Sequence, residues 1–220
     1  QQLQEQLERE QGNMLLNQIR SHFFYHTLNA LQALIVLKPE AAYKMAGDFA
    51  RYLRFTLDSV TADGGIGSFR EEIRAVRAYA DINQQQLGDR LHMVYEIPDV
   101  DFPIPLLTIQ PIVENAILHG VENSLTPCTI TVTAREQTAD ILLEVHNTGP
   151  CMTPEELDAV RRFAAKPKGH GIGLKNINDR LQLYFGSFGW QIDSDPEQGT
   201  RVRMTLPKKE KEDVQTADRG

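Results

Sequence analysis

A run of glycines and small polar residues at positions 61–68 (TADGGIGS) divides the chain into two stretches that differ in apolar spacing. Before this run, apolar side chains recur with the period of an α-helix. After it, helical segments alternate with short segments of β-strand character. This order is typical of the α+β class. We therefore expect a helical domain at 1–62, a mixed domain at 63–207 and a charged, disordered tail at 208–220.

The first stretch predicts two helices that meet at Pro39, where the missing amide hydrogen interrupts the helical pattern. The first helix places Phe24, Leu28, Leu31 and Ile35 on one face. One helical hairpin has too little apolar surface to cover that face. We therefore expect a homodimer in which two hairpins form a four-helix bundle. The Gln-rich segment before them predicts a further helix or the end of a coiled coil.

The second stretch predicts a two-layer α/β sandwich, in which helices cover one face of a mixed sheet. Its expected elements, in chain order, are a helix at 69–87 stopped by Gly88, a strand at LHMVYEIP, a helix at 105–119 stopped by Gly120, the strand pair TITVTARE and ILLEVHN, a flexible segment from 148 to about 169, a helix at LKNINDRLQLYFG, and a final hairpin of WQIDSD and TRVRMTLP.

Composition narrows the functional classes. The formal net charge is −7, so direct, sequence-independent binding to nucleic acid is not expected. The two cysteines, Cys128 and Cys151, form no CxxC pair, which argues against a disulfide scaffold or a cysteine zinc site. No apolar run approaches the ~20 residues of a membrane helix. Because the chain does not begin with Met, we expect a longer protein whose upstream part holds a membrane or sensing region.

His22 is a candidate phosphoryl acceptor on the first predicted helix. It lies away from the apolar face, on an arc that also holds His26. An exposed imidazole is neutral and nucleophilic near pH 7, as an acceptor must be. The position also suits an ordinary surface histidine, and His26, one turn away, is a rival acceptor.

The segment PIVENAILHG combines an acid, an amide and an imidazole on one predicted helix. The amide oxygen of Asn115 is a hard ligand that suits Mg²⁺. The neighbouring Glu114 carboxylate is suited to taking a proton from a nucleophile, and His119 follows Asn115 by one turn. A helix with an ordinary polar face would show the same residues.

The segment GHGIGLKN places three alternating glycines directly before a predicted helix. Gly169, Gly171 and Gly173 would let backbone amides approach a phosphate at a helix N-terminus. Lys168 and Lys175 flank the segment and would add positive charge. The spacing matches neither a Rossmann nor a Walker A motif, and a flexible glycine linker is the alternative.

Taken in order, these segments resemble the LytS/YehU-type sensor histidine kinases. RSHFFYHTLN is similar to the phosphoacceptor motif usually written NPHFLFNTLN, and FARYLRFTL with SFREEIRAVRAYADI matches the rest of that region. The N box of this family is similar to PLLTIQPIVENAILHG, and its glycine box is similar to GHGIGLKNINDRLQLYFG. The closing hairpin of the GHKL-type (Bergerat) ATPase fold is similar to EQGTRVRMTLP. The resemblance runs from about residue 15 to residue 207.

The resemblance implies a role for each matching residue. His22 would be phosphorylated, Asn115 would coordinate Mg²⁺ between the ATP phosphates, and Glu114 would assist proton removal. The implied nucleotide-binding residues are Asn115, His119, Asn147, Gly149, Lys168, Gly169, Gly171, Gly173, Leu174 and Thr200. The implied function is ATP- and Mg²⁺-dependent autophosphorylation, followed by transfer to an aspartate of a response regulator. The implied location is the cytoplasmic portion of a membrane-anchored protein.

Five positions depart from the family pattern. In the phosphoacceptor motif, Ser21 stands in place of the usual Pro and His26 in place of an Asn. Gln86 stands where an Arg is common. In the adenine-binding motif, Asn147 replaces the Asp and Cys151 replaces the second Gly. An amide accepts a weaker hydrogen bond from the adenine amino group than a carboxylate does. The changes at Asn147 and Cys151 therefore also fit a dimeric signalling scaffold with impaired nucleotide binding. A GHKL ATPase that works as a conformational clamp is a third interpretation.

Overall fold

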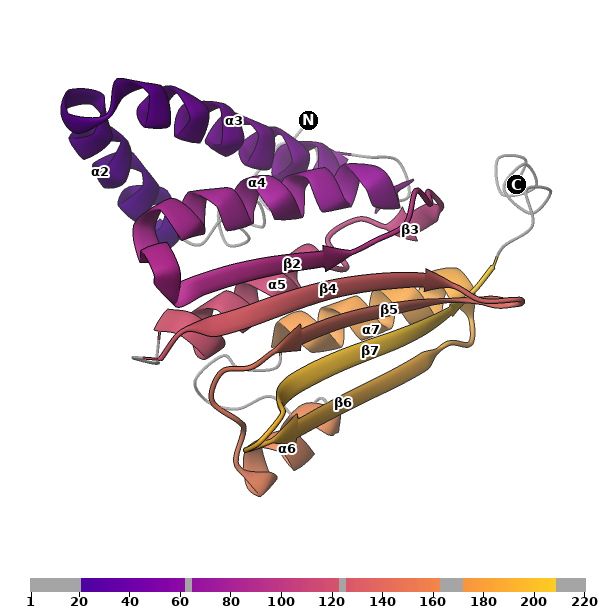
Figure 1. Cartoon of the computed structure of the whole chain (residues 1–220). Coiled ribbons are helices and arrows are strands. Elements are labelled where there is room, and N and C mark those ends of the chain that lie inside the picture. Colours follow the sequence, from indigo (N-terminus) through magenta and orange to yellow (C-terminus); the bar gives the residue numbers. More distant parts are fainter. Residues whose placement is uncertain (1–20, 62–64, 123–125, 163–171, 209–220) are drawn as a thin grey trace, which may run out of the picture. The chain divides into compact units, whose positions relative to one another are not determined.

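The computed structural model describes residues 21–61, 65–122, 126–162 and 172–208 (Figure 1). This part of the chain begins with helices. The chain groups into two units. The first takes in the described residues up to Leu91 together with Asp101–Gln110, and the second takes in His92–Val100 and the described residues from Pro111 onward. The predicted helix at 1–20 and the tail after Lys208 lie outside the described residues.

The first unit contains three helices, a short helical turn and two short strands. In chain order these are α2 (Ser21–Leu37), α3 (Pro39–Thr61), β1 (Ile66–Ser68), α4 (Phe69–Leu87), the turn at Gly88–Arg90, and β3 (Pro103–Pro105). The predicted pair of helices around Pro39 is confirmed, with Lys38 between them. The division into two units places α4 together with the helices α2 and α3. The functional boundary predicted at residue 62 stays a prediction.

An aromatic cluster joins the three helices of the first unit. The ring centroid of Phe23 on α2 lies 5.1 Å from that of Tyr52 on α3 and 4.7 Å from that of Tyr79 on α4. All three side chains are at least nine-tenths buried. By contrast, Leu28 and Ile35 on α2 are 38% and 62% exposed, so the described residues cover the predicted apolar face of this helix only in part.

The start of α4 is fixed by local and long-range contacts. The Ser68 hydroxyl caps the helix by accepting a hydrogen bond from the Glu71 amide at 3.3 Å. Strand β1, which ends at this cap, pairs antiparallel with β3, so that Ser68 lies opposite Pro103. The predicted stop at Gly88 is confirmed, because its amide donates to the carbonyl of Gln84.

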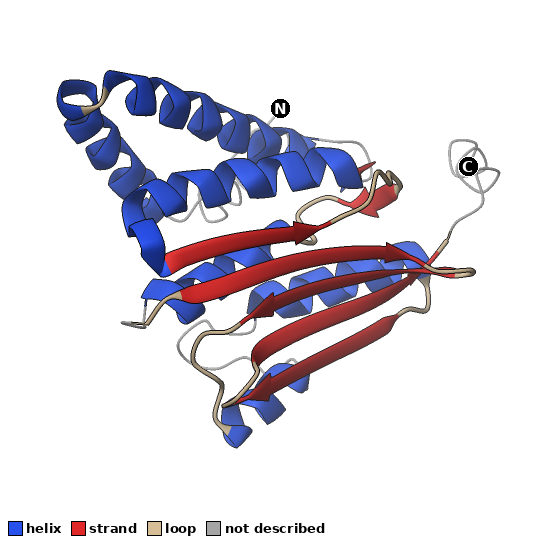
Figure 2. Ribbon diagram, in the orientation of Figure 1, coloured by secondary structure: helices blue, strands red, loops and turns tan. Residues whose placement is uncertain are grey.

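The second unit is built on a five-stranded sheet with the order β2-β4-β5-β7-β6. Its elements, in chain order, are β2 (Leu91–Glu96), α5 (Gln110–Ile117), a π-helical turn (Leu118–Glu122), β4 (Cys128–Glu136), β5 (Asp140–Asn147), α6 (Pro154–Arg161), α7 (Ile172–Phe185), β6 (Gly189–Asp195) and β7 (Gly199–Pro207). Helices α5 and α7 lie on one face of the sheet (Figure 2).

The helix-covered face of the sheet forms the core of the second unit. Val132, Val145, Val202 and Ile192 lie in register across β4, β5, β7 and β6, and all four are buried. These four strands are antiparallel, whereas the arrowheads of β2 and β4 point the same way in Figure 1, so the sheet is mixed. The predicted α+β sandwich with helices on one face is confirmed.

Three local predictions are corrected. The segment predicted to be flexible from residue 148 contains α6, whose N-cap Thr153 exchanges hydrogen bonds with Glu156 in a capping box. Helix α5 begins at Gln110 and not near residue 105, because the preceding residues form β3 and a turn. Gly120 does not stop this helix, because it lies inside the π-helical turn.

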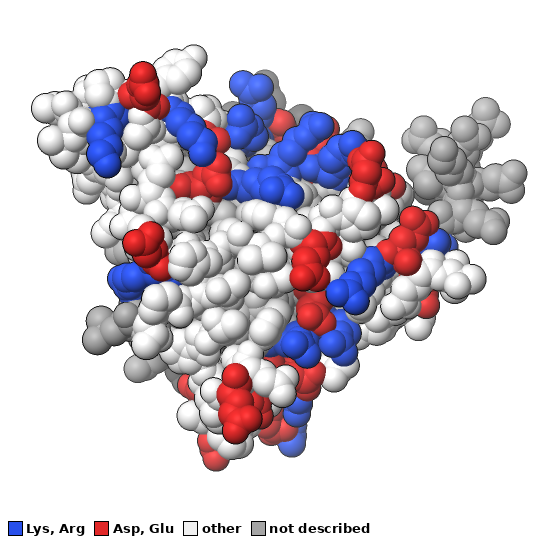
Figure 3. All heavy atoms as spheres, viewed as in Figure 1, with Lys and Arg blue, Asp and Glu red and all other residues white. Residues whose placement is uncertain are grey.

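Acidic and basic side chains neighbour one another on the face of the molecule drawn in Figure 3. Ion pairs within one unit include Lys44 with Asp81 at 3.1 Å and Arg135 with Glu96 at 3.3 Å. Exposed pairs of this kind contribute less than about 1 kcal/mol each. They therefore affect solubility more than stability.

Candidate functional site

Helix α5 carries the predicted acid and amide side by side. Glu114 is buried, with 6% of its surface exposed, whereas Asn115 is half-buried. Successive helical residues point about 100° apart, so the two side chains face different directions. His119 lies in the π-helical turn that follows and is also half-buried.

The N-terminus of α5 is held by a carboxylate from α4 that the sequence reasoning missed. Glu72 is fully buried, and its Oε1 accepts hydrogen bonds from the amides of Ile109 and Gln110, the latter at 3.1 Å. These amides are among those that a helix leaves without an internal partner at its start. Glu72 lies on the buried face of α4 together with Ile73 and Val76. The sequence contained a signal for this contact, because a charged residue on an apolar helix face needs a buried polar partner.

The turn that leads into α5 is constrained in its backbone. Leu107 has a φ of 61°, in the left-handed region that side chains other than glycine rarely adopt. The hydroxyl of Thr108 closes the turn by donating to the carbonyl of Pro105 at 2.6 Å. The helix that carries Glu114 and Asn115 therefore starts from a fixed backbone position.

The end of β5 places Asn147 on the helix-covered face of the sheet. Its side chain follows the buried alternation of Ile141, Leu143 and Val145, and only 6% of Asn147 is exposed. Thr200, its neighbour in register on β7, is also buried. The two predicted nucleotide-binding residues are thus brought together at this end of the sheet.

Three glycines let backbone segments approach this end of the sheet closely. A Cβ on Gly149 would lie 2.4 Å from the Cα of Gly120, and a Cβ on Gly120 would lie 3.0 Å from Nδ2 of Asn147. Gly199 has a φ of +82°, and a Cβ there would lie 2.0 Å from the Asn147 carbonyl oxygen. No larger residue fits at Gly149 or Gly199 without moving the backbone. The turn after α5 therefore contacts the loop after β5.

Hydroxyl groups fix the loop that follows β5. The Thr200 and Ser194 hydroxyls share a hydrogen bond of 2.8 Å, and Ser194 Oγ accepts from the Met152 amide at 2.8 Å. On the other side, Thr148 Oγ1 accepts from the Thr129 amide at 3.0 Å. Ser194 was not among the predicted site residues, because its position opposite Thr200 comes from the pairing of β6 with β7.

The two cysteines occupy different environments near this loop. Cys128 is buried, and this burial raises the pKa of its thiol. Its sulfur would lie 3.1 Å from a Cβ on Gly120, so it packs against the turn after α5. Cys151, which replaces the second glycine of the family motif, is exposed.

The predicted glycine-rich lid is described only at its C-terminal end. Lys168, Gly169 and Gly171 lie outside the described residues. Gly173 and Leu174 lie in the first turn of α7, where Gly173 is exposed and Leu174 is buried, so the helix begins earlier than predicted.

Lys175, which was predicted to add charge beside the lid, contacts its own helix. Its Nζ lies 2.6 Å from Oδ2 of Asp179, one turn further along α7. The hydrogen bond from Lys175 lowers the pKa of Asp179. Part of the positive charge of this lysine is therefore offset within α7.

His22 lies in the first turn of α2. Its side chain is outside the described part of the structure, so its orientation toward solvent stays a prediction. His26 is exposed one turn further along the same helix.

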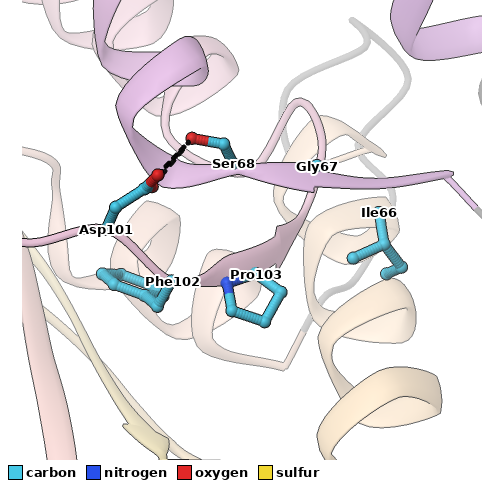
Figure 4. Close-up of a pocket in the computed structure, with 6 residues that line it drawn as sticks. All are labelled: Ile66, Gly67, Ser68, Asp101, Phe102 and Pro103. Carbon is cyan, nitrogen blue, oxygen red and sulfur yellow. Dashed lines mark hydrogen bonds between the residues drawn. The ribbon is translucent and has the colours of Figure 1, made fainter. Parts of the chain in front are cut away.

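One hollow in the described residues lies in the first unit, between β1 and the segment before β3 (Figure 4). It is lined by Ile66, Gly67, Ser68, Asp101, Phe102 and Pro103, none of which is a predicted site residue. Burial acts to raise the pKa of Asp101, but the hydrogen bonds from the Arg70 amide and the Ser68 hydroxyl outweigh it and hold that pKa below its usual range. The polar groups that line this hollow, Ser68 and Asp101, are therefore the groups that hold the start of α4.

The described residues contain no group of three or more His, Cys, Asp or Glu side chains able to hold a metal ion. None of the helices in the described ranges is both long enough and apolar enough to cross a bilayer. The only predicted metal ligand is the single amide oxygen of Asn115.

Comparisons with known proteins assign this architecture to a class. Residues 10–91 match the family model described as "Histidine kinase", and residues 105–210 match "Histidine kinase-, DNA gyrase B-, and HSP90-like ATPase". The catalytic domain of histidine kinase ThkA superposes with a TM-score of 0.53 at 18% identity, covering 65% of this chain and 97% of that one. These findings define a helical histidine kinase region followed by a GHKL-type ATPase fold.

Curated relatives narrow the class to a family. YwpD of Bacillus subtilis (strain 168) is 36% identical over 87% of this chain and 68% of its own length. The sensor histidine kinase YpdA of Escherichia coli (strain K12) is 31% identical over 94% of this chain and 36% of its own length. The sensor histidine kinase YesM of Bacillus subtilis (strain 168) is 33% identical over 86% of this chain and 32% of its own length. The chain belongs to the LytS-type sensor histidine kinases. It spans about a third of the length of YpdA and YesM.

Proposed function

We propose that this chain is the kinase core of a two-component system, which binds ATP with Mg²⁺, phosphorylates itself on His22 and passes the phosphoryl group to an aspartate of a response regulator. The observation that carries the proposal is the order of the two matched regions, because a histidine kinase region precedes an ATPase region in one chain. A GHKL ATPase that works only as a clamp would not need the first region.

The base of the nucleotide is proposed to bind at the end of β5. Asn147 and Thr200 lie side by side there, and the close approach of Gly120 to Gly149 brings the turn after α5 against this end of the sheet. The triphosphate would extend toward Asn115 on α5 and toward the lid before α7. His119, Lys168, Gly169, Gly171, Gly173 and Leu174 complete the proposed set of nucleotide-binding residues.

The donor chemistry of α5 fits Mg²⁺ bound together with ATP. An amide oxygen is a hard ligand, and Mg²⁺ usually keeps several waters and binds through one or two protein oxygens plus substrate phosphates. The half-buried position of Asn115 leaves its side chain partly accessible, as such a ligand must be. When bound, the ion would neutralise charge on the phosphates.

The proposed transfer requires a nucleophile and a proton acceptor. A lone pair on a ring nitrogen of His22 would form the new N–P bond while the bond from the γ-phosphorus to the β,γ-bridging oxygen breaks, so that ADP leaves with that electron pair. The ring proton that His22 must then lose is assigned to the Glu114 carboxylate. In the second step an aspartate oxygen of the regulator forms a P–O bond as the N–P bond breaks, and the electron pair returns to the imidazole.

The homodimer is proposed to form through α2 and α3. Large apolar side chains on these helices remain exposed in the single chain, namely Tyr25, Leu28, Ile35, Val36, Leu37, Tyr43 and Leu57. A second copy would cover them by twofold symmetry. We further propose that residues 1–62 serve dimerisation and phosphoryl acceptance, that residues 63–207 serve ATP binding, and that the chain is the cytoplasmic portion of a membrane-anchored sensor.

A dimeric scaffold without useful ATP binding is the second candidate function. The replacement of a carboxylate by Asn147 and of a glycine by Cys151 favours it. A titration with Mg²⁺-ATP distinguishes the two candidates, because a scaffold would bind no nucleotide at millimolar concentration.

Incubation of the chain with ATP labelled at the γ-phosphate, in the presence of Mg²⁺, tests the kinase proposal. A phosphohistidine is labile in acid and stable in base, so the protein should carry label with this stability. Hydrolysis of ATP without any protein-bound label would instead favour an ATPase clamp, and the absence of both would favour the scaffold.

A further inference from the structure

Helix α5, which carries Glu114 and Asn115, is short and is preceded by an apolar residue. It has eight residues, and isolated helices shorter than about 12–15 residues are marginal in water. The first amides of a helix have no partners inside it. The residue directly before α5 is Ile109, whose side chain offers no acceptor for these amides. The order of α5 therefore depends on contacts from outside the helix.

Helix α4 supplies the acceptor through the carboxylate of Glu72. Its Oε1 accepts hydrogen bonds from the amides of Ile109 and Gln110, the latter at 3.1 Å, and the residue is fully buried. Burial of a carboxylate is unfavourable unless hydrogen bonds compensate for the lost hydration. The presence of a carboxylate at this position is therefore explained by the two amides that it binds.

The segment before α5 caps α4 in return. The carboxylate of Asp101 accepts a hydrogen bond from the Arg70 amide at 3.0 Å and one from the Ser68 hydroxyl at 2.7 Å (Figure 4). Residues 68–72 and residues 101–110 are thus joined by a carboxylate from each segment. All of these contacts lie within the first unit.

Resting on the proposed function, we infer that Glu72 is a positioning residue for the nucleotide site. Asn115 lies in the second turn of α5, so a fixed start of this short helix holds the Asn115 amide in one place. With a loose start, part of the free energy of Mg²⁺-ATP binding would be consumed in ordering the helix. Glu72 therefore raises the affinity for the nucleotide through α5, without being its ligand.

Calorimetric titration of the full chain with Mg²⁺-ATP tests the inference with two variants. Glu72→Met keeps the approximate size of the side chain but removes its oxygen acceptors, whereas Glu72→Gln keeps one oxygen and removes the charge. We expect the affinity to fall by about tenfold or more in Glu72→Met and by about threefold to tenfold in Glu72→Gln. The smaller loss in Glu72→Gln would reflect the oxygen that this variant retains.

A role of Glu72 in stability alone would give a different result. It would lower the melting temperature and leave the affinity of the folded protein unchanged. Each titration is therefore made at a temperature where thermal unfolding shows the variant to be folded, and if Glu72→Met does not fold, Glu72→Gln decides. Amide hydrogen exchange at Ile109 and Gln110 gives a local measurement, and we expect it to be about tenfold faster in Glu72→Met.

Glu71→Met and Glu71→Gln are the matched controls, because Glu71 is the exposed neighbour in the same turn of α4. They make the same chemical changes away from the start of α5. We expect the affinity for Mg²⁺-ATP to stay within about twofold of the wild-type value in both.

The outcomes separate the inference from the proposed function. A folded Glu72→Met variant that binds Mg²⁺-ATP as tightly as the wild type would overturn the inference and leave the kinase proposal standing. Unchanged exchange at Ile109 and Gln110, or an equal loss of affinity in Glu71→Met, would do the same. A wild-type protein that does not bind Mg²⁺-ATP would overturn both.

Discussion

Asn115 is the residue on which the proposed Mg²⁺ dependence rests. Asn115→Ala removes one oxygen ligand from the ion, and the loss of one contact to a charged group corresponds to about 1.5–3 kcal/mol. We expect affinity for Mg²⁺-ATP to fall by about tenfold or more. Calorimetric titration of the variant and the wild type measures the change.

The same titration in the presence of a chelator supplies the control. Without Mg²⁺ the two proteins should bind ATP with similar affinity, because the amide would then have no ion to hold. Equal affinities in the presence of Mg²⁺ would remove Asn115 from the metal site.

Among the residues that the sequence alone could not place, Glu72 and Ser194 are the most informative. Both act through partners that are distant in sequence, since Glu72 contacts Ile109 and Gln110 and Ser194 contacts Met152. Motif spacing describes neighbours within one element, so it could place Glu114 and Asn115 on one helix but could not identify the groups that hold that helix. The contacts of Asn147 and Thr200 likewise required the strand register.

The link between α4 and α5 gives a prediction at the level of secondary structure. Glu72→Gln keeps the size of the side chain but removes the charge that strengthens the hydrogen bonds to two backbone amides. We expect the free energy of unfolding to fall by about 1–2 kcal/mol. Denaturant unfolding at neutral pH measures the difference.

Glu71→Gln is the control for this effect, because Glu71 is the exposed neighbour on the same turn of α4. An exposed substitution there should change the unfolding free energy by less than about 1 kcal/mol. If both variants lost equal stability, the cap on α5 would contribute nothing specific.

The helices and hairpins with strong periodicity were predictable from the sequence. The pair α2 and α3, the strands β4 and β5, and the final hairpin of β6 and β7 follow from local apolar spacing and turn residues. The pairing of β1 with β3 was not predictable, because each strand has three residues and they lie far apart in sequence. Helix α6 was missed although its signal, Thr153 followed by Pro154 and Glu156, was present.

For the whole molecule, the exposed apolar face of α2 predicts an obligatory second copy. Leu28→Asp would place a charge in the proposed bundle core, which costs several kcal/mol when the charge has no partner. We expect the wild type to be a dimer at micromolar concentration and the variant to dissociate. Light scattering coupled to size exclusion measures both masses.

Gln32→Asp is a matched variant one turn further along α2, at an exposed position on the polar arc. It introduces the same charge and should remain dimeric. A wild-type mass equal to one chain would contradict the dimer, and so would a dimeric Leu28→Asp variant.

Labelling of His22→Gln beside His26→Gln tests the central claim most directly. Both variants are incubated with Mg²⁺ and ATP labelled at the γ-phosphate, and ATP binding is measured in parallel. Only His22 matches the acceptor position of the family motif, so His22→Gln should bind ATP and carry no acid-labile label, whereas His26→Gln should keep its label. Label that persists in His22→Gln and disappears in His26→Gln would contradict the assignment of the phosphoryl acceptor.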